Sequence, residues 1–98
     1  MLIRIVKLTF KLGNIVKFEK IFKETKPHIL DFEGCISLEL FQDKTNPNIF
    51  FTYSQWTSEA HLNKYRNSDF FNSVWSKTKV LFHAKPEAWS VQKKHFGD

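Results

Sequence analysis

Alternating apolar positions predict four β-strands in this chain of 98 residues. The predicted strands are Leu2–Phe10, Cys35–Gln42, Ile49–Trp56 and Ala88–Lys93. In the second of them, Ile36, Leu38 and Leu40 share one face. Turn-forming residues at 43–48 join the second strand to the third, so we expect an antiparallel hairpin. The first and third strands carry large apolar side chains on both faces, and we expect both faces of the sheet to be covered.

Apolar residues spaced three and four apart predict a helix over Ile15–Phe32, and Gly34 is expected to end it. Asn14 is the expected N-cap, because its side chain can accept from a free backbone N–H. Pro27 lies inside the pattern and lacks a backbone donor, so it predicts a kink or a restart of the helix.

Two shorter helices are predicted at Glu59–Arg66 and Asp69–Phe82. Each follows a hydroxyl residue that can cap it, Thr57 or Ser58 for the first and Ser68 for the second. The order β-α-β-β-α-β predicts an α+β, ferredoxin-like fold with one antiparallel sheet and the helices on one face. A second copy of the chain would cover the other face, so we expect a homodimer.

The chain is expected to be a single domain over residues 1–98, with its core at 3–93 and a loose tail at 94–98. The formal net charge is +5, but it comes mostly from scattered lysines, which favours a solvated surface over a nucleic-acid site. No apolar run reaches the roughly 18 residues of a membrane span, and the N-terminal stretch lacks the apolar core of a signal peptide. With Cys35 as the single cysteine, a cytoplasmic location is expected.

Several kinds of chemistry find no support in the residue pattern. The three glycines form no phosphate-binding loop, and none of the nucleophile motifs of serine hydrolases occurs. The four histidines (28, 61, 83 and 95) form no ligand pair for a metal, and Cys35 reads as a small buried residue. The β-α-β-β-α-β order along the chain is also that of an RNA-recognition domain. The glycine- and aromatic-rich strand motif of that domain is absent, because Ile49–Trp56 contains no glycine. Aromatic residues make up 16% of the chain, which favours a packed core or a ring-lined pocket.

Four short motifs together resemble the antibiotic biosynthesis monooxygenase family. They are Phe32-Glu33-Gly34-Cys35, Asp43-x-x-Asn46-Pro47-x-x-Phe50, Trp56-x-Ser58-Glu59-Ala60 and Ser68-Asp69-Phe70-Phe71. The resemblance covers residues 3 to 93 and implies a dimeric α+β barrel. It also implies oxygenation of quinols or phenols without metal or flavin, whereas a separate branch of the family binds and degrades heme.

Three positions depart from the family's patterns. Ser54 stands where members often carry Glu, and Tyr65 stands where the quinol-oxidising type often carries His. Trp75 stands where the heme-degrading branch has its iron-ligating His, and an indole cannot ligate iron. We therefore expect no cofactor, and in particular no functional heme site.

The resemblance leads to one hypothesis for the site. The expected substrate-binding residues are Tyr53, Trp56, Phe71 and Trp75, and the expected polar or catalytic residues are Ser54, His61, Tyr65 and His83. They would bind a small quinol or phenol and favour its anion in a water-poor cavity, so that O₂ can react with it. The alternative is a non-catalytic dimer that binds a small apolar molecule. Ordinary core packing is the competing explanation for each aromatic residue.

Overall fold

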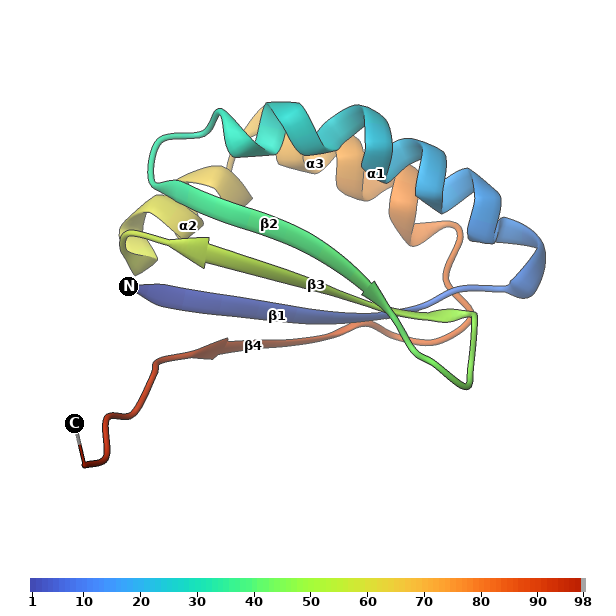
Figure 1. The fold of residues 1–98 in the computed structure, drawn as a ribbon. Helices are drawn as coiled ribbons and strands as arrows, with labels where there is room; N and C mark the ends of the chain where they lie inside the picture. Colours follow the sequence, from blue (N-terminus) through green and yellow to red (C-terminus); the bar gives the residue numbers. More distant parts are fainter. Residues whose placement is uncertain (98) are drawn as a thin grey trace.

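The computed structural model describes residues 1–97, which form one four-stranded sheet and a layer of helices (Figure 1). The strands are β1 (Leu2–Thr9), β2 (Cys35–Gln42), β3 (Ile49–Trp56) and β4 (Glu87–Val91). The helices are α1 (Ile15–Leu30), α2 (Glu59–Arg66) and α3 (Asp69–Lys79), with a 3₁₀ turn η1 (Leu12–Asn14) before α1. The α+β, ferredoxin-like prediction is confirmed.

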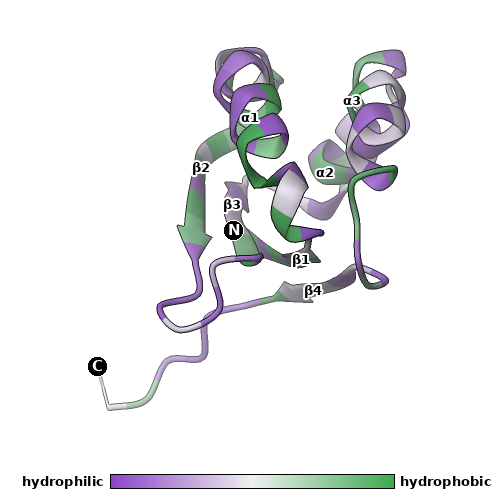
Figure 2. Ribbon diagram, turned by 90° about the vertical axis from the view of Figure 1, so that its right-hand side faces the viewer, coloured by the Kyte–Doolittle hydropathy of each residue, from purple (hydrophilic) through white to green (hydrophobic). Residues whose placement is uncertain are grey.

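The sheet has the strand order β2-β3-β1-β4, and every neighbouring pair is antiparallel. Helices α1 and α3 run side by side over one face of the sheet, as Figure 2 shows from the end of the molecule. The opposite face has no helix over it in either view. The predicted one-sided helical layer is therefore confirmed, and the sheet has an inner face toward the helices and an outer face away from them.

Residues predicted as N-caps precede all three α-helices, and two of them cap through their side chains. The hydroxyl oxygens of Ser58 and Ser68 each accept a hydrogen bond from a backbone N–H of the following helix, those of His61 and Phe71. Asn14 precedes α1, but its side chain makes no cap; it donates instead to the carbonyl of Leu81, 3.3 Å away. Asn14 is thus the N-cap residue of α1, as predicted, but the 3₁₀ turn before α1 takes the place of a side-chain cap.

Three helices and strands differ from the prediction in their continuity or in where they begin or end. Pro27 lies inside α1, which continues as one helix to Leu30 rather than restarting. The third helix ends at Lys79 and not at Phe82, because Phe82 leaves the helix to bridge Phe10 at the end of β1. The last strand spans Glu87–Val91, one residue earlier at its start than the sequence pattern indicates.

The strand β2 contains an irregularity that the alternating pattern does not reveal. Cys35 pairs with Trp56 and Ser37 with the preceding residue of β3, so Ile36 is an extra residue in a β-bulge. Leu38 is buried, but Ile36 is 48% exposed. The bulge therefore interrupts the regular alternation that was predicted for Ile36, Leu38 and Leu40.

Buried aromatic rings hold the inner face against the helices. The rings of Phe10 and Phe18 stack with centroids 4.2 Å apart, and Phe50 packs edge-on against both. Trp56 anchors a second cluster with Leu2 and Leu62 at the other end of the sheet. Between these two clusters the inner face is not filled by side chains.

Candidate functional site

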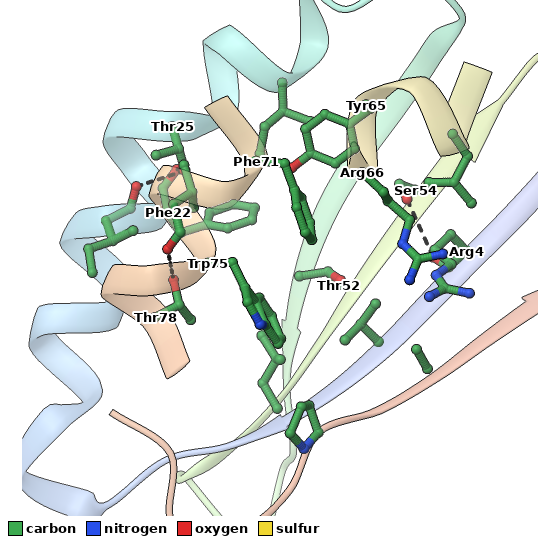
Figure 3. A pocket seen from close by; sticks show the side chains of 18 of the residues that line it. Arg4, Phe22, Thr25, Thr52, Ser54, Tyr65, Arg66, Phe71, Trp75 and Thr78 are labelled. Atoms are coloured by element: carbon green, nitrogen blue, oxygen red, sulfur yellow. Dashed lines mark hydrogen bonds between the residues drawn. The ribbon is translucent and has the colours of Figure 1, made fainter. Parts of the chain in front are cut away.

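The unfilled region is a cavity of about 330 Å³ between the inner sheet face and the helices (Figure 3). This volume lies at the lower end of the range for small-molecule pockets. Most of its wall is apolar. The residues that line it come from β1 and β3 (Arg4, Val6, Leu8, Thr52, Ser54, Trp56), from α1 (Phe18, Ile21, Phe22, Thr25, Ile29), from α2 and α3 (Leu62, Tyr65, Arg66, Phe71, Val74, Trp75, Thr78) and from the last segment (Pro86, Ala88).

Four aromatic residues form a continuous part of this wall. Trp56 and Tyr65 stack with ring centroids 5.2 Å apart, and Tyr65 meets the next ring, Phe71, edge-on at 5.2 Å. Phe71 and Trp75 lie one helical turn apart on α3, and their rings are nearly parallel, with an angle of 9°. Flat rings suit contact with a flat aromatic ligand, since stacked and edge-on geometries are both favourable.

Ser54 lies on the cavity wall, but its hydroxyl already has partners. The oxygen accepts from Nε1 of Trp56 at 3.0 Å, and the hydroxyl donates to the carbonyl of Arg4 at 3.5 Å. These bonds fix the Trp56 ring, which is only 1% exposed. Ser54 therefore helps to hold the Trp56 ring in place.

Tyr65 is the polar wall residue whose ring contacts both Trp56 and Phe71. Within residues 1–97, its phenolic oxygen makes no hydrogen bond to another protein group, and Figure 3 shows the hydroxyl directed toward Phe71. Burial raises the pKa of the Tyr65 phenol, and the nearby Cys35 thiol adds to the rise. Tyr65 therefore stays a neutral O–H donor near neutral pH and is not a general base.

Sequence reasoning missed two residues of the wall, Arg4 and Arg66, which are the only arginines of the chain. Their guanidinium groups lie next to each other at the end of the cavity where Ser54 stands (Figure 3). Burial, and next the charge of Arg66, lower the pKa of Arg4. Arg4 shares the buried face of β1 with Leu2 and Val6, and a cation in such a row was the signal that could have found it.

Comparison with known proteins places this geometry in a family. Residues 1–74 match the family model described as antibiotic biosynthesis monooxygenase. The chain belongs to the antibiotic biosynthesis monooxygenase family. A search of curated protein sequences found no match.

Solved structures support the fold of this family member. A conserved protein from Methanosarcina mazei Go1 is 26% identical, with a TM-score of 0.89 over 96% of this chain and 94% of that one. A structure described as an antibiotic biosynthesis monooxygenase is 17% identical, with a TM-score of 0.90 over 97% of this chain and all of the other. The ferredoxin-like architecture of the family is thus present over nearly the whole chain.

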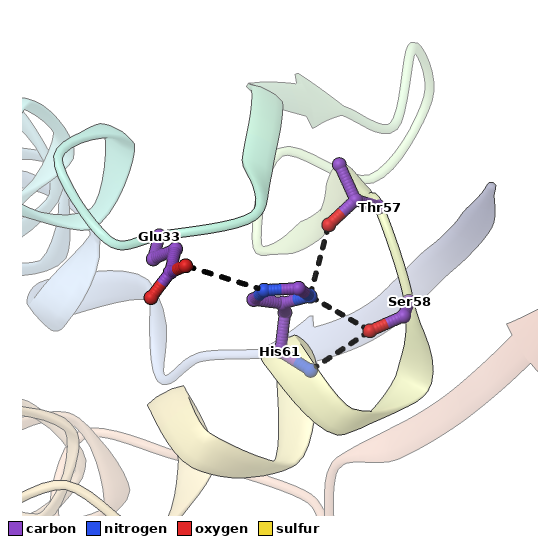
Figure 4. A network of polar contacts seen from close by, with 4 residues as sticks. All are labelled: Glu33, Thr57, Ser58 and His61. Carbon is purple, nitrogen blue, oxygen red and sulfur yellow. Dashed lines mark hydrogen bonds and ion pairs between the residues drawn. The ribbon is translucent and has the colours of Figure 1, made fainter.

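His61 lies outside the cavity of this family member, beside the turn that follows α1. Its Nδ1 is 2.7 Å from the Ser58 hydroxyl and 2.9 Å from the Thr57 hydroxyl, and its Nε2 is 3.9 Å from a carboxylate oxygen of Glu33 (Figure 4). The arrangement resembles a Ser-His-Glu triad, but the Ser58 oxygen also accepts from the backbone N–H of His61 to cap α2. The ring packs against Gly34, where a Cβ would overlap it. This network links the turn after α1 to the N-terminal end of α2.

Two further predicted site residues also lie away from the cavity. Tyr53 alternates with Ser54 on β3 and therefore points to the outer face of the sheet. His83 is exposed after α3, where its backbone N–H donates to the carbonyl of Thr9. Of the eight predicted residues, the structure brings five together around the cavity, namely Ser54, Trp56, Tyr65, Phe71 and Trp75, and leaves out Tyr53, His61 and His83.

The residues of the cavity do not fit the histidine-ligated heme of the heme-degrading branch. No histidine of the described chain lines the cavity, and Trp75 offers only an indole N–H there. Within residues 1–97, no three His, Cys, Asp or Glu side chains are grouped to hold a metal ion. In the same part of the chain, no helix has both the length and the apolar character to cross a membrane.

Proposed function

We propose that this chain is a monooxygenase that oxidises a small quinol or phenol with O₂ and needs no metal or flavin. The observation that carries the proposal is the polarity of the cavity wall. Its polar side chains are hydroxyls, two indole N–H groups and two guanidinium groups, and none of the lining residues is a carboxylate. Such a wall stabilises a bound anion, and the apolar rings around it exclude water.

The chemistry requires a substrate that is rich in electrons. A quinol or phenol that has lost its proton can transfer an electron to O₂ directly, which the neutral molecule does slowly. In a balanced reaction a quinol and O₂ give a hydroxyquinone and water, so the substrate supplies every electron. Tyr65 contributes by donating a hydrogen bond to the substrate oxyanion, since its phenol stays protonated.

Oxygen uptake over a panel of quinols and phenols tests this proposal. We expect the wild type to exceed the buffer rate on at least one compound. We expect Tyr65→Phe to lose about 2–4 kcal/mol of barrier reduction, a rate loss of about 30- to 1000-fold, at an unchanged Tm. Tyr53→Phe is the matched control, because it removes the same hydroxyl from the outer face. Rates no higher than buffer across the panel would contradict the proposal.

One observation favours a second candidate, a non-catalytic protein that binds a small apolar molecule. The cavity wall holds no histidine and no carboxylate, so it offers no ordinary general base to take the substrate proton. Substrates that are already ionised at the assay pH distinguish the two candidate functions, because they need no general base to remove their proton. Oxidation of an ionised quinol, with tight but unproductive binding of the neutral form, would favour the oxygenase over the binding protein.

We also propose that the active form is a homodimer joined through the outer sheet face, and that it works in the cytoplasm as one domain over residues 1–98. The outer face carries Phe51, Tyr53 and Trp89 without any helix to cover them. An apolar face of this extent is typical of a protein–protein interface. Light scattering at micromolar concentration tests the dimer, and a stable monomer would contradict it.

A further inference from the structure

We propose that the two arginines Arg4 and Arg66 form a binding site for the carboxylate of an aromatic acid whose ring lies in the cavity. The inference deepens the proposed function, on which it rests for the cavity being the substrate site. It names the class of ligand, an aromatic compound with a planar anionic group at one end.

The first argument is electrostatic. Both guanidinium groups line one end of the same cavity, and Figure 3 draws them side by side beside Ser54. Two like charges at close range repel each other. In the described chain, the ion pairs are Lys7 with Glu87 and His61 with Glu33, so neither arginine has a carboxylate within 4 Å. A bound anion would remove the repulsion.

The second argument is the choice of residue. Thirteen of the fifteen cationic residues are lysines, and both arginines line this end of the cavity. Guanidinium groups are planar and donate through a rigid fork that matches the two oxygens of a carboxylate. Nη1 of Arg4 donates to the Ser90 hydroxyl at 2.9 Å, which orients the group and leaves other N–H donors free.

The position of Arg66 has a simpler partial explanation. It lies in the last turn of α2, where a cation interacts favourably with the helix dipole. Lys64 lies in the same turn and meets the same requirement without lining the cavity. The helix end therefore explains a positive charge on α2 but not the placement of Arg66 against Arg4.

The third argument is the neighbouring wall. The residue before Arg66 is Tyr65, which stacks on Trp56, and the next inward residue after Arg4 on β1 is Val6. A ligand held by both arginines would thus place its body directly against aromatic and aliphatic side chains. With about 330 Å³ available, one or two fused rings fit the space.

Calorimetric titration with matched acids and amides tests the inference. The probes are benzoate and 2-naphthoate, each compared with its amide, which keeps the ring but not the charge. We expect at least one acid to bind at least about tenfold more tightly than its amide, and added salt to reduce this preference. Arg66→Gln should abolish most of the preference, and Arg66→Lys should restore part of it.

Lys64→Gln is the matched control, because it removes the same charge from the same exposed helix and should leave the preference unchanged. Equal affinity of acids and amides, or no detectable binding of either pair, would overturn the inference, as would a full preference in Arg66→Gln. Oxygen uptake on uncharged quinols distinguishes the two proposals. If such quinols are oxidised but acids show no preference, only the inference fails. If acids bind through Arg66 but no compound is oxidised, only the proposed function fails.

Discussion

The two faces of the sheet differ in the burial and the polarity of their side chains. Phe50 and Phe51 are consecutive on β3, yet Phe50 is only 2% exposed under the helices and Phe51 lies on the uncovered face. The inner face mixes large rings with Arg4, Thr52 and Ser54 around a cavity. The outer face is largely apolar, with the ion pair of Lys7 and Glu87 across β1 and β4.

This difference separates the roles of the aromatic residues. Rings on the inner face either fill the core or leave a space with polar groups around it, and that space suits a small ligand. Rings on the outer face contact one another across the strands, as Phe41 and Tyr53 do, but no helix lies over them, so we expect their partner to be another flat surface. An abundance of aromatic residues therefore has two causes in this protein, a pocket on one side and an expected subunit contact on the other.

The largest expected effect comes from truncating the two neighbouring phenylalanines of β3. Phe50→Ala should lower the free energy of unfolding by about 3–5 kcal/mol, because it leaves a cavity among Phe10 and Phe18. Phe51→Ala should cost the monomer only about 1 kcal/mol, because its ring is partly exposed there. Urea unfolding at low protein concentration measures both values. Similar losses would show that the faces do not differ in packing.

The second prediction concerns the proposed dimer and again substitutes Phe51 on the outer face. Phe51→Glu should weaken the dimer at least about a hundredfold, since a carboxylate would be buried in the subunit contact. The monomer should keep its fold, because position 51 lies opposite Lys7 on β1 and the new charge would face a cation. Sedimentation or light scattering over a dilution series measures the change.

Val16→Glu is the control for this variant, because Val16 is an exposed apolar residue on α1, far from the outer face. It should leave the dimer intact. A monomeric wild type, or equal effects of both variants, would break the proposed assignment of the outer face to the subunit contact.

Strand alternation allowed much of this two-sided arrangement to be predicted from the sequence. It placed Phe50, Ser54 and Trp56 on one face and Phe51 and Tyr53 on the other, and short-range capping by Ser58 and Ser68 fixed the helix starts. What the pattern could not give was which face the helices cover. Tyr53 was for that reason expected in the site and lies outside it.

The missing parts depend on contacts between distant segments. The β-bulge that exposes Ile36 arises from the pairing of β2 with β3, which alternation within β2 does not encode. The Arg4–Arg66 pair forms only when α2 packs over β1 and β3, and each arginine alone looks like a surface charge. His61 has the residue type expected in a site, but its ring packs on Gly34, and no local pattern signals that contact.

The smallest predicted effect compares the two tyrosines through the pH dependence of stability. The pKa of Tyr65 is raised in the folded protein above its unfolded value near 10, so the native state keeps a proton that the unfolded state releases at high pH. The contribution of this proton to stability is constant below about pH 10 and falls as the pH rises above it, by up to about 1.4 kcal/mol per pH unit.

Tyr65→Phe removes the titrating group, so the stability of the variant should fall less steeply than that of the wild type above pH 10. Urea unfolding at pH 8 to 11 measures the difference, with Tyr53→Phe as the control for a lost hydroxyl on the outer face. Parallel curves for the wild type and Tyr65→Phe would show that the inner face does not hold this phenol in its neutral form, and would remove the argument for Tyr65 as a donor.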